Sequence, residues 1–148
     1  MPSSPTELTF AGPARPECLD AIHDLLDRLW EAGTGADDID RAMFTTAVLE
    51  IANNIVTHNG PDSSVLLSLF LSADSGVLRA ELLENGSPAN VDTATASLPD
   101  DFAESGRGIA LARMALDEFG YEQTDEQNRW QLERRIGNPN RGHEKAWT

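Results

Sequence analysis

Apolar residues between positions 44 and 60 recur at the spacing of one helix face. They fall at i, i+3, i+4, i+7, i+8, i+11 and i+12, and they are Phe44, Ala47, Val48, Ile51, Ala52, Ile55 and Val56. This spacing predicts a helix that buries one apolar stripe. It is the best amphipathic helix in the sequence, so we treat it as the centre of the fold.

Polar residues interrupt this central helix beside its apolar stripe. At roughly 100° per residue, Glu50 and Asn54 are neighbours along one margin of the stripe, and His58 follows one turn later. Asn53 points almost opposite the stripe. A carboxylate and a carboxamide at the margin of a core need polar partners, which a neighbouring element or a ligand can supply. Motifs further along the chain favour a ligand.

One strand and one helix are predicted before the central helix. The strand is short and apolar, at residues 7–10. The helix covers residues 19–29, where the leucines and the isoleucine share one stripe, and Gly33 and Gly35 end it. Asp37 is then placed to cap the central helix, because its carboxylate can accept a hydrogen bond from a first-turn N–H group.

A hairpin, a long loop and a third helix are predicted after the central helix. Two runs of alternating hydrophobicity, 65–72 and 77–83, predict a β-hairpin with a four-residue loop. Small, acidic and proline residues then form a loop of about twenty residues that ends at Ser105, and a loop of that length is usually functional. The third helix is expected to include Phe119 and to end at Gly120.

The order of the elements sets the expected fold class. Two closing strands are predicted, one from Tyr121 and one over residues 129–136. Strands and helices do not alternate as in a doubly wound parallel sheet. We therefore expect an α/β two-layer sandwich, with a mixed, mostly antiparallel sheet covered on one face by three helices. One domain should span residues 1–136, followed by a flexible tail at 137–148.

Composition narrows the classes of partner and compartment. Among 148 residues, 25 are acidic and 11 are basic, which gives a formal net charge of −14. This charge opposes binding to nucleic acid or to an anionic membrane and favours a protein partner of complementary charge. Cys18 is the only cysteine, so a reducing compartment is expected, with Cys18 as a buried bystander. Because no signal peptide or spanning apolar run is present, we expect a cytoplasmic protein.

The motif Gly106-Arg107-Gly108 precedes the third predicted helix. Backbone N–H groups and the dipole of a helix N-terminus can bind a phosphate, glycine permits close approach, and Arg107 adds positive charge. The alternative is a tight turn into a helix with no ligand. The sequence contains no P-loop, and its single lysine is Lys145 in the expected tail.

Two further groups of residues are candidates for a site. Glu84-Asn85-Gly86 follows a predicted strand and combines a hydrogen-bond acceptor with a glycine turn, although a plain surface turn would look the same. On the central helix, the amide oxygen of Asn54 suits Mg²⁺, and the carboxylate of Glu50 could act as a base or orient water. It is the order and spacing of the three motifs that favour a site.

These motifs, taken in order, resemble a known superfamily. E-x-x-x-N-x-x-x-H, then E-N-G, then S-G-R-G-I-A-L-A-R are similar to the N-box and the two glycine boxes of Bergerat-fold ATPases, which include gyrase, heat-shock chaperones and sensor histidine kinases. The short lid, the length and the ending N-R-W-Q-L-E-R-R-I look most like bacterial anti-sigma-factor serine kinases. The resemblance extends from Thr9 to Ile136.

The resemblance implies a site for ATP and Mg²⁺. Glu50 matches the family's catalytic carboxylate, and Asn54 matches the asparagine that holds Mg²⁺ against the phosphates. Gly86 matches the glycine that the nucleotide passes closely. The motif 106–108 matches the phosphate-binding residues, under a lid at 90–105.

Glu84 departs from the family pattern. The family has an aspartate there, which accepts a hydrogen bond from the adenine amino group, and one extra methylene displaces that contact by about 1 Å. The resemblance implies a kinase that phosphorylates a serine of an antagonist protein of the anti-anti-sigma (STAS-like) class and that sequesters a sigma factor. The alternative, which Glu84 favours, is a regulatory module that binds without phosphate transfer. The sequence leaves open whether the chain forms a homodimer.

Overall fold

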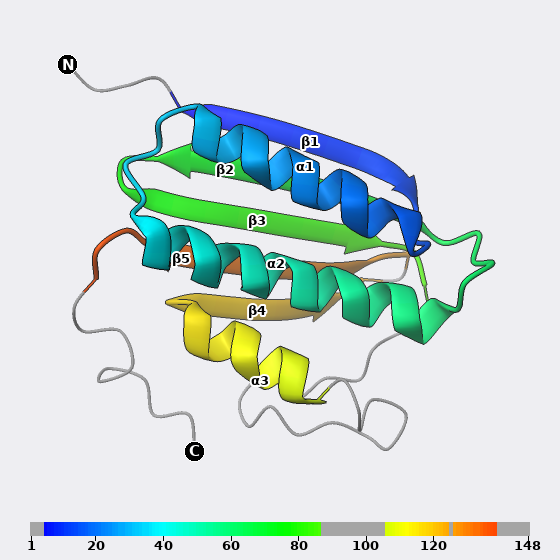
Figure 1. Ribbon diagram of the computed structural model, residues 1–148. Coiled ribbons are helices and arrows are strands. Elements are labelled where there is room, and N and C mark those ends of the chain that lie inside the picture. The colour runs from blue at the N-terminus through cyan, green and yellow to red at the C-terminus, as the bar shows by residue number, and fades with distance from the viewer. Residues whose placement is uncertain (1–4, 87–105, 125, 139–148) are drawn as a thin grey trace.

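The computed structural model describes residues 5–86, 106–124 and 126–138. These residues form one sheet and three helices. Figure 1 shows the helices on the same face of the sheet, which confirms the predicted two-layer α/β sandwich. The elements in chain order are β1 (Thr6–Pro13), α1 (Glu17–Glu31), α2 (Asp38–Asn59), β2 (Leu66–Asp74), β3 (Val77–Glu84), α3 (Gly106–Ala115), β4 (Glu118–Gln123) and β5 (Asn128–Arg135). None of these helices has the length and apolar character that crossing a bilayer requires.

The sheet has five strands in the order β1-β2-β3-β5-β4. Each pairing between the described strands is antiparallel, so the parallel component of the expected mixed sheet is not found among them. The reason is that β2 and β3 form one hairpin and β4 and β5 form another, and the two hairpins join through antiparallel β3 and β5. The register of that central pair places Glu84 opposite Asn128.

The apolar core lies between the helices and the sheet. Along β2, β3 and β5, buried side chains alternate with more exposed ones, as expected for a sheet with one covered face. The large side chains that are fully buried include Trp130 from β5, Phe44 and Ile51 from α2 and Leu26 from α1. The stripe predicted for the central helix is therefore confirmed as core.

The first strand and the hairpin differ in length from the prediction. β1 extends over Thr6–Pro13, and not only over 7–10, because it pairs with β2 along its whole length. The hairpin turn consists of Ser75 and Gly76, with φ angles of 53° and 78°, so the loop has two residues and not four. Positive φ at both positions is the geometry of a tight hairpin turn that matches strand twist.

The third helix ends earlier than predicted. α3 stops at Ala115, and Phe119 and Gly120 belong to β4. The backbone N–H of Asp117 already donates to the carbonyl of Glu133 at 2.8 Å, which begins the pairing with β5. Phe119 stacks on the indole of Trp130 with ring centroids 6.4 Å apart. Tertiary packing therefore decides a boundary that helical spacing placed one turn later.

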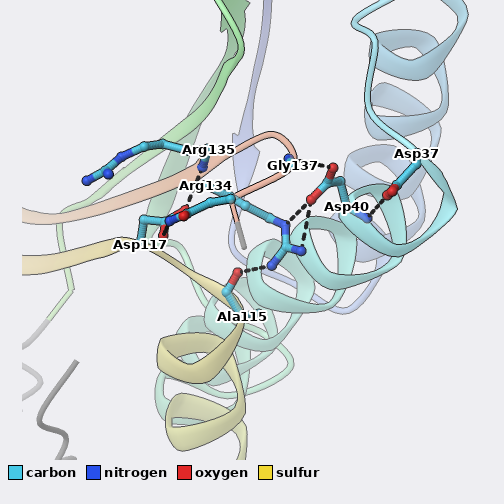
Figure 2. Close-up of polar contacts among 8 residues, drawn as sticks. Asp37, Asp40, Ala115, Asp117, Arg134, Arg135 and Gly137 are labelled. Carbon is cyan, nitrogen blue, oxygen red and sulfur yellow. Dashed lines mark hydrogen bonds and ion pairs between the residues drawn. The ribbon is translucent and has the colours of Figure 1, made fainter. Parts of the chain in front are cut away.

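A buried ion pair joins three elements at the N-terminal end of α2 (Figure 2). The Asp37 carboxylate caps the helix, as predicted, by accepting from the backbone N–H of Asp40 at 2.8 Å. Arg134 donates through Nε and Nη2 to Oδ1 of Asp40, both at 2.9 Å, and through Nη1 to the carbonyl of Ala115 at 2.6 Å. The N–H of Gly137 donates to Oδ2 of Asp40 at 3.2 Å. Arg134 thus fastens the end of α3 to the start of α2.

Cys18 lies in α1 and is buried. Burial raises the pKa of its thiol, because the thiolate loses hydration. A hydrogen bond with the backbone of Arg15 lowers the pKa, but its effect is smaller. A raised pKa lowers the thiolate fraction and with it the reactivity. This agrees with the prediction that Cys18 is a bystander.

Candidate functional site

Asn54 has an unusual environment on α2. Its side chain is 2% exposed, and neither the amide oxygen nor the amide nitrogen has a hydrogen-bond partner among the residues that the structure describes. Asn53, the preceding residue, is exposed, as its helical angle predicted. An unpaired buried amide costs roughly 1–3 kcal/mol of stability, so its position beside the core calls for an explanation other than packing. A ligand that pairs with the carboxamide supplies one.

Glu50, one helical turn before Asn54, contacts the first turn of α3. Its side chain is partly buried, and its Oε2 occupies the place that a Cβ on Gly108 would take. A side chain at position 108 would therefore require the carboxylate of Glu50 to move away. The helix dipole stabilises negative charge beside the first turn of a helix. It therefore favours this carboxylate, and it would also favour the anionic oxygens of a phosphate at the same helix end.

Replacing Gly108 with alanine tests this contact. Alanine favours a helix over glycine by about 1 kcal/mol, but here the new methyl group must displace the flexible carboxylate of Glu50. We expect Gly108→Ala to stabilise the fold more in a Glu50→Ala background than in the wild type, with a coupling energy of about 1 kcal/mol in a double-mutant cycle measured by urea unfolding. Equal effects in the two backgrounds would show that Glu50 and Gly108 do not interact.

Glu84 lies at the end of β3 and is almost completely buried, at 3% exposure. Its Oε1 accepts hydrogen bonds from the backbone N–H of Gly86 at 2.8 Å and from Nδ2 of Asn128 at 3.0 Å. Its Oε2 accepts from the indole Nε1 of Trp130 at 3.3 Å. The carboxylate is thus bonded to three donors that belong to the protein.

Gly86 brings the turn after β3 against the end of α2. A Cβ at this position would lie 2.6 Å from Oδ1 of Asn59 and 3.0 Å from Oε1 of Glu84. Asn59 is itself held by a hydrogen bond from its Nδ2 to the carbonyl of Ile55 at 2.8 Å. The close approach that the sequence assigned to a nucleotide at Gly86 is made here by the side chain of Asn59.

The candidate residues gather at one end of the sandwich. Figure 1 shows the end of β3, the end of α2 and the start of α3 on the same side of the molecule. Two contacts link them, Glu50 with Gly108 and Gly86 with Asn59, while Asn54 lies between Glu50 and Asn59 along α2. Gly106 opens α3 as predicted, whereas the side chain of Arg107 and the lid expected at 90–105 lie outside the described residues.

Sequence reasoning missed three residues of this region: Asn59, Asn128 and Trp130. The last two reach Glu84 from β5, and only the register of β3 with β5 brings them there. A signal for Asn59 was its position at the end of the central helix, one residue after His58. Trp130 was correctly predicted to lie in a strand, but nothing in the sequence indicated that its indole N–H donates to Glu84.

A hollow on the other face of the sheet contains none of the candidate residues. Its lining includes Phe70, Arg79, Glu81 and Glu133. Cross-strand ion pairs fill part of this face, since Arg79 Nε lies 2.8 Å from Glu133 Oε1 and Arg129 Nη2 lies 2.7 Å from Glu81 Oε2. Arginines and carboxylates that pair with each other here offer no unpaired polar group of the kind found at Asn54.

Comparison with known proteins identifies the fold. The model of the histidine kinase-like ATPase domain family matches residues 12–133. No curated protein matches the sequence significantly. The solved structure of the RsbU and RsbW domains of Rv1364c from Mycobacterium tuberculosis is similar, with a TM-score of 0.60 and 22% identity over 93% of this chain.

This chain covers 34% of that solved chain, and at 22% identity the likeness shows the fold alone. Both findings confirm the fold expected from the resemblance to Bergerat-fold ATPases. Because the family match extends over most of the sequence, from residue 12 to residue 133, the protein belongs to the histidine kinase-like ATPase domain family.

Proposed function

We propose that the protein binds ATP with Mg²⁺, transfers the γ-phosphate to a serine of an antagonist protein, and controls the availability of a sigma factor. Membership of the histidine kinase-like ATPase family supports the nucleotide. The solved structure that contains an RsbW domain has a similar fold, which is consistent with the proposal. The net charge of −14 supports protein partners over nucleic acid or an anionic membrane.

The observation that carries the proposal is the unpaired carboxamide of Asn54. An amide oxygen is a suitable hard ligand for Mg²⁺, and a nucleotide with its metal would give this buried group the partner that the fold does not provide. Bound Mg²⁺ supplies positive charge to the phosphates. That charge matters in this chain, because the only lysine, Lys145, comes after the last strand.

Glu50 is the candidate base in this proposal. Its carboxylate takes the proton of the accepting serine hydroxyl onto an oxygen atom, and the contact of Oε2 with Gly108 holds that oxygen at the start of α3. The backbone N–H groups of the first turn of α3, from Gly106 to Gly108, bind the phosphate oxygens with help from the helix dipole. Base and phosphate site are thereby adjacent.

A second candidate function has an observation of its own in its favour. The carboxylate of Glu84, which occupies the position of the family's adenine-binding aspartate, is bonded to Gly86, Asn128 and Trp130. If the base of the nucleotide cannot be held, the chain acts as a binding module that regulates its partner by occupancy alone. Measured phosphate transfer distinguishes this module from a kinase.

The substitution Asn54→Ala tests the metal ligand. Because Mg²⁺ would lose a protein ligand and the phosphates would lose part of their counter-charge, we expect ATP affinity to fall at least tenfold, about 1.4 kcal/mol, in calorimetric titrations with Mg²⁺. The free energy of unfolding should not fall, because the amide that is removed has no hydrogen-bond partner in the described part of the chain.

Asn53→Ala is the matched control, since it makes the same change on the exposed side of the same helix and should leave ATP affinity unchanged. Equal affinity in the wild type and Asn54→Ala would remove Asn54 from the site.

A further inference from the structure

We infer that the carboxylate of Glu84 holds the surrounding fold together and does not hydrogen-bond the purine, so that the nucleotide site binds ATP and GTP with similar affinity. The inference rests on the proposed nucleotide site and concerns its selectivity. It follows from the hydrogen bonds of one carboxylate, and it predicts a property opposite to that of a site in which a free carboxylate faces the base.

The acceptor capacity of Glu84 is largely used within the protein. A carboxylate oxygen has two lone pairs, and Oε1 receives two donors, the N–H of Gly86 at 2.8 Å and Nδ2 of Asn128 at 3.0 Å. Oε2 receives the indole N–H of Trp130 at 3.3 Å. A purine amino group that approached Glu84 would have to displace a donor of the fold or compete with it for Oε2.

The donors are themselves fixed by the surrounding structure. Tyr121 donates its hydroxyl proton to Oδ1 of Asn128 at 2.7 Å, which turns Nδ2 of the same amide towards Glu84. A flipped amide would instead point its oxygen at the carboxylate, which is repulsive. Tyr121 also packs on the indole of Trp130 with ring centroids 4.5 Å apart. The orientation of both donors therefore follows from their contacts on β4 and β5.

The network is also closed to solvent. Glu84 is 3% exposed, and Asn128 and Trp130 are each 1% exposed. Removing the carboxylate from these partners would leave the buried indole N–H of Trp130 without this acceptor and would leave Nδ2 of Asn128 with one acceptor fewer, and the loss of a buried hydrogen bond is destabilising. The fold thus opposes any rearrangement that would turn Glu84 towards a ligand.

The chemistry of the two purines links this network to selectivity. Adenine presents an amino donor where guanine presents a carbonyl acceptor, and an ionised carboxylate only accepts. A free carboxylate at the base would therefore favour ATP strongly, because sites built to hydrogen-bond one group reject the analogue that lacks it. When the fold uses the carboxylate, this source of discrimination disappears and affinity comes from the phosphate end, near Asn54 and Gly108.

The extra methylene of glutamate, compared with aspartate, lets the carboxylate of Glu84 reach all three of its donors. Glu84 extends far enough to bond the turn at Gly86 and, across the strand pair, the side chains of Asn128 and Trp130. Aspartate is shorter by one methylene and cannot keep all three donors. Glu84→Asp should therefore free acceptor capacity and create a preference for ATP.

Calorimetric titration of the full chain with ATP and with GTP, each with Mg²⁺, tests the inference. We expect the Kd of the wild type for GTP to lie within about tenfold of its Kd for ATP, and we expect Glu84→Asp to shift this ratio at least threefold towards ATP. Glu81→Asp is the matched control, because it shortens a glutamate of the same strand that pairs with Arg129 on the other face of the sheet, and it should leave the ratio unchanged.

Trp130→Phe provides a second variant in case Glu84→Asp fails to fold, as judged by circular dichroism. It removes the donor to Oε2, together with part of a buried aromatic ring, and keeps Glu84 itself, so it should also shift the ratio towards ATP. A wild-type preference for ATP above tenfold, or an unchanged ratio in every folded variant of the network, would overturn the inference and leave the proposed nucleotide site standing. Absence of binding by either nucleotide would overturn both.

Discussion

Replacing Asp40 with alanine is expected to lower the free energy of unfolding by about 3–5 kcal/mol. The side chains of Asp40 and Arg134 are 4% and 3% exposed, so the substitution leaves a guanidinium buried without its carboxylate. It also removes the acceptor of the Gly137 N–H. Unfolding in urea, monitored by circular dichroism, measures the loss of free energy.

Asp38→Ala is the control for this prediction. It removes the same side chain from the same helical turn, but Asp38 is exposed, so only about 0.3–1 kcal/mol from the helix dipole should be lost. The double variant Asp40→Leu with Arg134→Met should recover much of the stability, because buried pairs can often be replaced by apolar side chains of similar volume. Similar losses in Asp40→Ala and Asp38→Ala would contradict the role of the buried pair.

The layers of the fold were predictable because local patterns determine them. The stripe from Phe44 to Val56 and the glycines after α1 needed no knowledge of tertiary contacts. Asp37 was also identified correctly, since a cap depends only on neighbours within the same turn. The fold class and the order of the helices and strands followed from these local signals.

The errors lie where distant contacts decide. Helical spacing continued through Phe119, but stacking on Trp130 and pairing with β5 place that residue in a strand. The hairpin turn was predicted too long, because Ala73 and Asp74 still pair with Leu78 and Val77. Such pairings depend on register, which the sequence of one strand does not contain.

The candidate site was predictable in part for the same reason. Glu50 and Asn54 share a helix face, so their proximity follows from spacing, and the contact of Glu50 with Gly108 agrees with a common site. Two of the three partners of Glu84, Asn128 and Trp130, come from β5, more than forty residues away in sequence. Their identity could not be read from the E-N-G motif.

Glu50→Ala is expected to reduce phosphate transfer by roughly 10²- to 10⁴-fold, because a positioned base contributes an effect of that size. ATP affinity should change little, since the carboxylate acts on the accepting serine and not on the bound nucleotide. Binding of the sigma factor should also be retained. Initial rates of transfer, measured beside calorimetric ATP affinities, separate the two effects.

Glu50→Gln is the matched control for shape. It keeps the volume and the contact with Gly108 but cannot take up a proton as a carboxylate does, so its rate should fall nearly as far as that of the alanine variant. A rate for Glu50→Gln close to that of the wild type would show that Glu50 orients its surroundings and does not act as a base.

The most direct measurement of the central claim is transfer of a labelled γ-phosphate from ATP to an antagonist protein that has first been shown to bind the chain. With Mg²⁺ present, the wild type should label the antagonist on serine, Glu50→Ala should not, and an antagonist whose accepting serine is replaced by alanine should remain unlabelled. Absence of transfer by the wild type, despite measured ATP binding and a confirmed antagonist complex, would contradict the kinase and leave a binding module in its place.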